Sequence, residues 1–178
     1  MATKQAPLIT PAEVREILAE PKETAKAVTW VHRPAPGQMQ WMEFVSSCRL
    51  RGETRDDIIL RAIYRPARTA VYGQAAITLP AACSASLFIG PHRVLGIDTN
   101  DAYHTNVSGS DLPLYRKVLE QRTHLHIWHH EGEGYAEPIE PALNDIATLI
   151  PYFLQRANLT LPGGFAHPLK GRQIELLI

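Results

Sequence analysis

Apolar and polar residues alternate one by one through most of the middle of this chain, and no other sequence feature constrains the fold as strongly. The longest examples are residues 40–51 and 57–65. In an extended strand, such alternation sends successive side chains to opposite faces of a sheet. Turn formers separate the alternating stretches, as at Gly90-Pro91, which predicts a hairpin between two strands. We therefore expect a mainly antiparallel sheet.

Helical patterns occur near the two ends of the chain. Thr10-Pro11-Ala12-Glu13 has the form of a capping box with proline at the first helical position, which predicts a helix ending before Pro21. Pro141 opens a second helical pattern. Pro151 falls inside it, and we expect this proline to kink the helix, to start another or to cut it short.

The composition is that of an ordinary globular domain. The chain has 178 residues, of which 45% are hydrophobic and 20% charged, and this argues against extensive disorder. We expect a single domain over residues 1–178. A sheet with helices grouped at the chain ends is typical of the α+β class. The predicted fold is therefore α+β, a mainly antiparallel sheet with an N-terminal helix and a C-terminal helix packed on it.

Bulk properties argue against several functional classes. The formal net charge is zero, so no global field draws the protein to nucleic acid or to an anionic membrane. No apolar run approaches the about 20 residues that span a bilayer, and the first residues lack the apolar stretch of a secretory signal. Two cysteines are too few for a disulfide framework or a thiolate metal site. We expect no membrane association and a cytoplasmic location.

Histidine is concentrated in one block of the sequence. Five of the eight histidines fall within residues 104–130. In the predicted strand around His124 and His126, alternation places both imidazoles on one face, with Leu125 and Ile127 on the other. If Leu125 and Ile127 face the core, the two histidines together face a groove or solvent.

The shared face of these histidines is compatible with three roles. Two imidazoles at this spacing can hold a divalent metal, with His104 or Asp98 as a third ligand, so His104, His124 and His126 are candidate metal ligands. They can equally act as an acid–base pair on a phosphodiester, one taking a proton and the other giving one. The third possibility is a polar sheet face that only forms hydrogen bonds.

Polar residues flank the histidines on both sides. Asp98 ends a predicted strand and is followed by a loop, a common location for functional side chains because a rigid scaffold positions them. We expect Asp98 and Glu137 to orient the catalytic histidines. Asparagine also commonly forms turns, but the candidate substrate-binding residues in this block are Asn100, Asn106 and Tyr135.

Arginine is frequent between positions 49 and 68, where six occur. Arg61 and Arg65 share one face of a predicted strand and are candidate contacts to an RNA backbone, because the planar guanidinium suits phosphate. The alternative is a solvated strand face, balanced by the acidic residues Glu53, Asp56 and Asp57.

The central block also resembles known proteins. It contains Val94-Leu-Gly-Ile-Asp98-x-Asn100, His104-Thr-Asn106, His124-Leu-His126-Ile-Trp and Tyr135-Ala-Glu137-Pro138. This order is similar to that of a group of small bacterial proteins of unknown function, and more distantly it resembles TumE-type toxins of toxin–antitoxin loci. The resemblance covers residues 93–158, a little over a third of the chain. It implies a shared architecture.

Two functional hypotheses follow. The first is a toxin-like or mobile-element accessory protein that acts on RNA through the histidine cluster, by histidine-based or metal-assisted phosphodiester cleavage. The second is a non-catalytic module that binds a protein, such as an antitoxin or a neighbouring gene product, through an exposed sheet edge or the loop at residues 100–121. Whether the chain is an enzyme is left open by the sequence.

Overall fold

The computed structural model describes residues 9–33, 41–73, 75–99 and 103–170. Strands hold 49% of the described residues and helices 14%, so the expectation of an α+β fold is wrong and the described fold is mostly β. The reason is that additional segments pair as strands, including residues 68–72 and 75–79 and parts of the loop expected at 100–121. The second helix also begins only at Ile146, five residues after Pro141.

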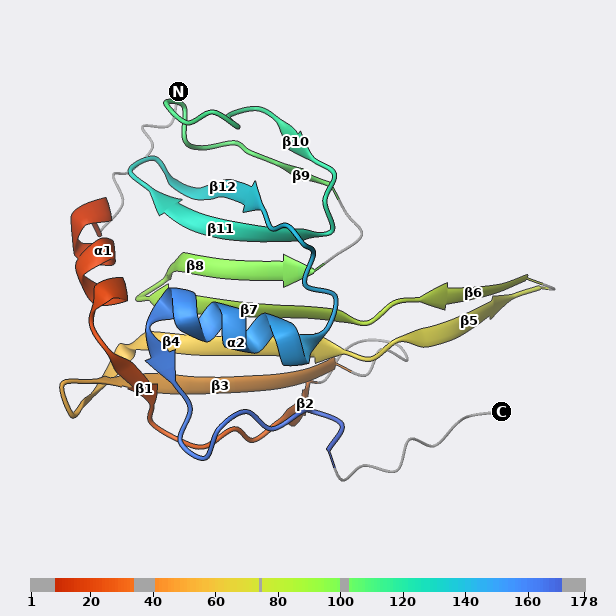
Figure 1. Ribbon diagram of the computed structural model, residues 1–178, viewed down its shortest axis with the longest axis horizontal. Coiled ribbons are helices and arrows are strands. Elements are labelled where there is room, and N and C mark those ends of the chain that lie inside the picture. The colour runs from red at the N-terminus through yellow and green to blue at the C-terminus, as the bar shows by residue number, and fades with distance from the viewer. Residues whose placement is uncertain (1–8, 34–40, 74, 100–102, 171–178) are drawn as a thin grey trace.

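One curled sheet of nine strands forms the body of the molecule (Figure 1). Its order is β12-β11-β8-β7-β4-β3-β1-β13, and β2 also pairs with β3. Neighbours are antiparallel apart from the parallel pair β1 and β13, which confirms the predicted antiparallel character of the sheet. The strands are β1 (Lys22–Thr24), β2 (Val31–Arg33), β3 (Trp41–Leu50), β4 (Glu53–Arg65), β7 (Ala82–Ile89), β8 (His92–Thr99), β11 (Thr123–His129), β12 (Gly132–Pro138) and β13 (Leu159–Thr160).

Two short hairpins extend this sheet. β5 (Arg68–Tyr72) and β6 (Ala75–Leu79) pair with each other and form an arm that projects well beyond β4 and β7 (Figure 1). The side chains of Val71 and Ile77 on this arm are 70% and 49% exposed. β9 (His104–Thr105) and β10 (Val118–Leu119) form the second hairpin, beside β12.

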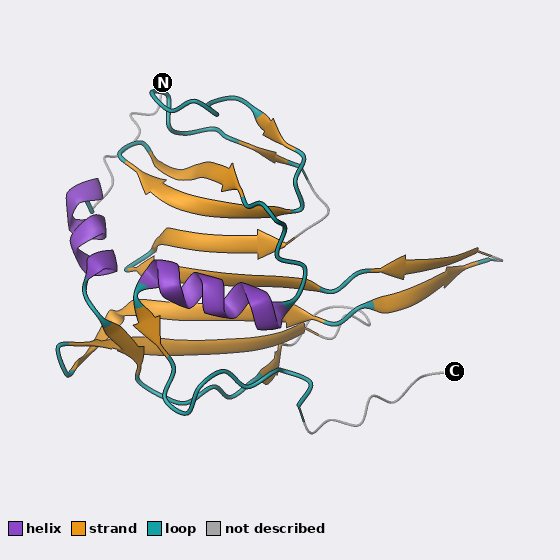
Figure 2. Cartoon of the chain, in the orientation of Figure 1, coloured by secondary structure: helices purple, strands orange, loops and turns teal. Residues whose placement is uncertain are grey.

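Two helices flank the sheet (Figure 2). α1 (Pro11–Ala19) begins with the predicted capping box, in which the Thr10 side chain accepts from the Glu13 backbone N–H and the Glu13 carboxylate accepts from that of Thr10. α2 (Ile146–Ala157) is capped by Asp145 and contains Pro151 in its interior. No helix in the described part of the chain is long and apolar enough to cross a membrane.

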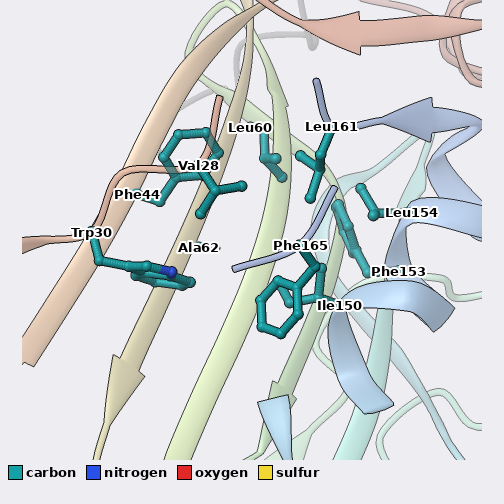
Figure 3. Close-up of a pocket in the computed structure, with 10 residues that line it drawn as sticks. All are labelled: Val28, Trp30, Phe44, Leu60, Ala62, Ile150, Phe153, Leu154, Leu161 and Phe165. Atoms are coloured by element: carbon teal, nitrogen blue, oxygen red, sulfur yellow. The ribbon is translucent and has the colours of Figure 1, made fainter. Parts of the chain in front are cut away.

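The core lies between α2 and one face of the sheet. Leu149 and Phe153 of α2 are fully buried, as are Leu87 and Ile97 of the central strands. A narrow crevice beneath the helix is lined by apolar and aromatic side chains (Figure 3): Val28, Trp30, Phe44, Leu60, Ala62, Ile150, Phe153, Leu154, Leu161 and Phe165. None of these side chains is charged, so none could orient a ligand through an ion pair. We therefore assign this crevice to the core.

Candidate functional site

The sheet face opposite α2 carries a group of polar side chains beside Val45, Ile59 and Ile63 of β3 and β4, and is called the polar face below. Directly paired residues on neighbouring strands project to the same face. One such row crosses four strands through Arg61, Ser86, Gly96 and His126. A second row places His124 beside Asp98 and Ser84.

The predicted division of β11 between two faces is confirmed by its register. Leu125 pairs with Ile97, which is fully buried in the core, so Leu125 faces the α2 side. His124 and His126 therefore project to the polar face together. They are nevertheless buried, with 1% and 6% of their surfaces exposed, and the ring of His104 from β9 lies against both.

Three histidines converge on this face. The ring centroids of His104 and His126 are 4.8 Å apart, and those of His104 and His124 are 5.5 Å apart. The His124 and His126 rings stack at 5.8 Å. The loop histidine thus reaches the two strand histidines across β12, as the sequence hypothesis requires.

His104 is positioned by its neighbour Asn106. The Asn106 side chain is fully buried, accepts a hydrogen bond from the Ala136 backbone N–H at 2.7 Å, and donates to the Ala136 carbonyl at 2.9 Å. It also donates to the Leu114 carbonyl at 3.0 Å. This amide therefore takes the place of a strand partner for β12 and ties the loop to the sheet edge. It is buried in the scaffold, whereas its predicted role was to bind substrate.

Arg93 and Asp98 complete a network around His126. The Asp98 carboxylate lies 3.0 Å from Nε2 of His126 and accepts a hydrogen bond from Arg93 at 3.0 Å. The second terminal nitrogen of Arg93 lies 3.1 Å from Nδ1 of His126. Because a guanidinium only donates, Nδ1 acts as the acceptor and Nε2 carries the proton donated to Asp98.

Gly96 makes room for this network. A Cβ atom at position 96 would lie 3.2 Å from Cδ of Arg93 and 3.4 Å from Oγ of Ser86. The arginine stem therefore lies flat over the glycine. Neither Arg93 nor Gly96 was predicted from the sequence, although a glycine inside a strand is a known sign of close approach by another group.

Burial and charge set the protonation states of the cluster. Burial acts to raise the pKa of Asp98, but the hydrogen bond from His126 and the charges of His126 and Arg93 outweigh it and lower that pKa. Burial lowers the pKa of His124 to about 4, and the neighbouring His126 and His104 contribute to the same shift. Burial, followed by the charge of His126, also lowers the pKa of His104 against hydrogen bonds with Gly134 and Asn106.

Several imidazole nitrogens in this cluster are buried without a hydrogen-bond partner. They are both ring nitrogens of His124 and Nε2 of His104. Buried polar atoms are nearly always paired, so such atoms mark a place for a water or a ligand. Within the described residues, however, the nitrogens of His104, His124 and His126 do not all come within 4.8 Å of one another, so the rings would have to turn to share a metal ion.

The structure does not bring the other predicted residues to the histidines. Tyr135 pairs with Ile127 and Glu137 with Leu125, so both project to the face opposite the histidines. Tyr135 is buried against the loop at Gly109. Asn100 lies outside the described residues.

The arginine-rich segment is largely balanced by acidic partners. Arg61 lies on the polar face, where it donates to Glu43 at 2.6 Å. Arg65 donates to the Pro80 carbonyl and lies over the Trp41 ring. The remaining ion pairs are Arg49 with Glu23, Arg51 with Glu20 and Arg55 with Asp57. The segment therefore presents much less positive charge than its arginines alone suggest.

No protein-family model, curated protein or solved structure matches this chain, so the geometry above is the basis for a functional assignment.

Proposed function

We propose that the histidine cluster cleaves RNA by acid–base catalysis. The observation that carries this proposal is the approach of His104 to His126. His126 also contacts the Asp98 carboxylate and the Arg93 guanidinium. A base, an acid with its orienting carboxylate and a phosphate-binding cation are the groups that this reaction needs.

His104 is the proposed general base. Burial keeps its imidazole neutral near pH 7, and its Nε2 has no partner. In the proposed step, Nε2 takes the proton of a ribose 2′-hydroxyl as its oxygen bonds to phosphorus. The bond from phosphorus to the 5′-oxygen then breaks, which leaves a cyclic phosphate on one fragment.

His126 is the proposed general acid that protonates the departing 5′-oxygen. Asp98 supports this role because its carboxylate lies 3.0 Å from Nε2 and accepts the proton there, which orients the ring and leaves Nδ1 as the atom that transfers a proton. In the free protein, Nδ1 faces Arg93. A phosphate competes for the guanidinium fork, and binding it would draw Arg93 away from Nδ1 and free that atom for proton transfer.

RNA cleavage assays test this assignment. Purified, untagged protein should cut a fluorophore–quencher RNA, leave the same sequence intact when it is made as DNA, and remain active in EDTA. His126→Ala and His104→Ala should each lower kcat/KM about 10²- to 10⁴-fold, while His32→Ala, an exposed histidine of β2, should not. Equal activity of His126→Ala and the unmodified protein would refute the proposal, and a requirement for added metal would favour metal-assisted cleavage.

A non-catalytic protein-binding role is the second candidate. It is favoured by apolar side chains that stand exposed around the β9–β10 hairpin, namely Tyr103, Val107 and Val118. Such side chains together on one segment are typical of interaction surfaces. In a pull-down with a partner encoded nearby, Val107→Asp and Val118→Asp would weaken the complex and His126→Ala would not. The reverse pattern would exclude this candidate.

A further inference from the structure

A second group of ligating side chains lies at the turn between β11 and β12, apart from the network around Asp98. One possible ligand atom from each of Asp111, His129 and His130 lies within 4.8 Å of the other two. We propose that these residues form a binding site for a divalent transition-metal ion of the zinc type. The site is independent of the proposed RNA cleavage.

The end of β11 and the turn that follows it bring the two histidines together. In a regular strand, consecutive side chains project to opposite faces. The pairing of β11 with β12 shifts register between Ile127 and His129, however, and the His129 and His130 ring centroids lie only 3.9 Å apart. Because His130 lies in the turn after β11, strand alternation does not hold it on the face opposite His129.

The hydrogen bonds between Glu131 and Ser110, called the clamp below, hold Asp111 against the histidines. The Glu131 carboxylate accepts from the Ser110 backbone N–H at 3.1 Å and from the Ser110 hydroxyl. Because Ser110 precedes Asp111 and Glu131 follows His130, the clamp joins the two segments that carry the ligands. Oδ1 of Asp111 lies 2.7 Å from Nε2 of His129 as a result.

The donor set matches known metal chemistry. Two imidazoles and one carboxylate are an established ligand set for zinc and for other divalent transition metals. The Asp111 side chain is 65% exposed and His130 is exposed, so an ion has access to the site and keeps positions open for water.

Metal binding requires the ring proton of His129 to change nitrogen. The Glu131 backbone N–H donates to Nδ1 of His129 at 3.2 Å, so Nε2 carries the ring proton and shares it with Asp111. An ion bound at Nε2 requires the other neutral tautomer, so this proton moves to Nδ1 by exchange with solvent and the ring stays neutral. The backbone hydrogen bond then gives way, and the Glu131 carboxylate, 3.9 Å from Nδ1, is the acceptor that supports the bound ring.

Titration of the full-length, untagged, EDTA-treated protein with Zn²⁺ by calorimetry tests this site, with Co²⁺ absorption as a spectroscopic measure of ligation. Asp111→Asn and His130→Ala should each remove one equivalent of bound metal. Glu131→Ala should keep the equivalent but weaken its affinity about 10- to 100-fold, because it removes the clamp.

Two control variants separate this site from other histidines. His32→Ala removes an exposed histidine of β2, and His126→Ala alters the histidine cluster. Both should retain the equivalent that Asp111→Asn loses. Urea denaturation confirms that each variant is folded. The proposal is overturned if Asp111→Asn and His130→Ala bind as much Zn²⁺ as the unmodified protein, or if that protein binds none.

Discussion

The lowered pKa of the buried His124 imidazole predicts by how much the free energy of unfolding falls at low pH. Its pKa is about 4 in the folded protein against an ordinary value of 6.5. Between these values the unfolded chain binds a proton that the folded protein does not, so stability falls as the pH falls from 6.5 to 4. One pKa unit corresponds to about 1.4 kcal/mol. His124 alone should therefore lower the free energy of unfolding by about 3 kcal/mol between pH 7 and pH 4.

A neutral side chain at this position isolates the effect. His124→Gln removes the titrating group, while Asp98 and His104, whose pKa values are also lowered, stay in both proteins. Urea denaturation at pH 7, 5.5 and 4 should show a loss of stability that is about 3 kcal/mol smaller in the variant. His32→Gln, which makes the same substitution on the exposed strand β2, is the matched control. Parallel pH profiles for His124→Gln and the unmodified protein would refute the reasoning.

Three further substitutions test the scaffold around the site. Asn106→Ala leaves buried backbone groups of β12 unpaired and should cost about 3 kcal/mol in urea denaturation, whereas an exposed hydrogen bond would cost under about 1 kcal/mol. Gly96→Ala should displace the Arg93 side chain and impair RNA cleavage while the protein stays folded by circular dichroism; unimpaired cleavage would contradict the role of Arg93. Replacing residues 68–79 by a two-residue turn should leave the urea midpoint nearly unchanged because β4 and β7 pair independently of the arm, and a large fall would show that the arm supports the core.

Local patterns in the sequence were sufficient to predict several structural features. The capping box predicts the start of α1 because its hydrogen bonds join residues only three positions apart. Period-two alternation predicts that His124 and His126 share a face, since strand geometry alone determines this. β3 and the part of β4 from Asp57 to Arg65 follow from the same rule, whereas β4 begins earlier, at Glu53, in residues that the sequence predicts as a turn.

Other features depend on pairing between distant segments. Tyr135 and Glu137 were expected beside the histidines, but the register of β12 against β11 places them opposite Ile127 and Leu125. A shift of one residue would reverse their faces, and no local pattern specifies that register. The fold class was wrong for a related reason, because short segments such as residues 68–79 become strands only through their partners.

The sequence by itself determined which side chains of β11 lie on the same face of the sheet, because alternation along a strand is a local property. Only the tertiary structure decided which other side chains contact them. His104 reaches the cluster because Asn106 binds across to Ala136, and Arg93 reaches it because Gly96 leaves space above the sheet. These contacts join segments up to 33 residues apart, as between Arg93 and His126. Their existence depends on strand order and register, which are set by the packing of the whole sheet.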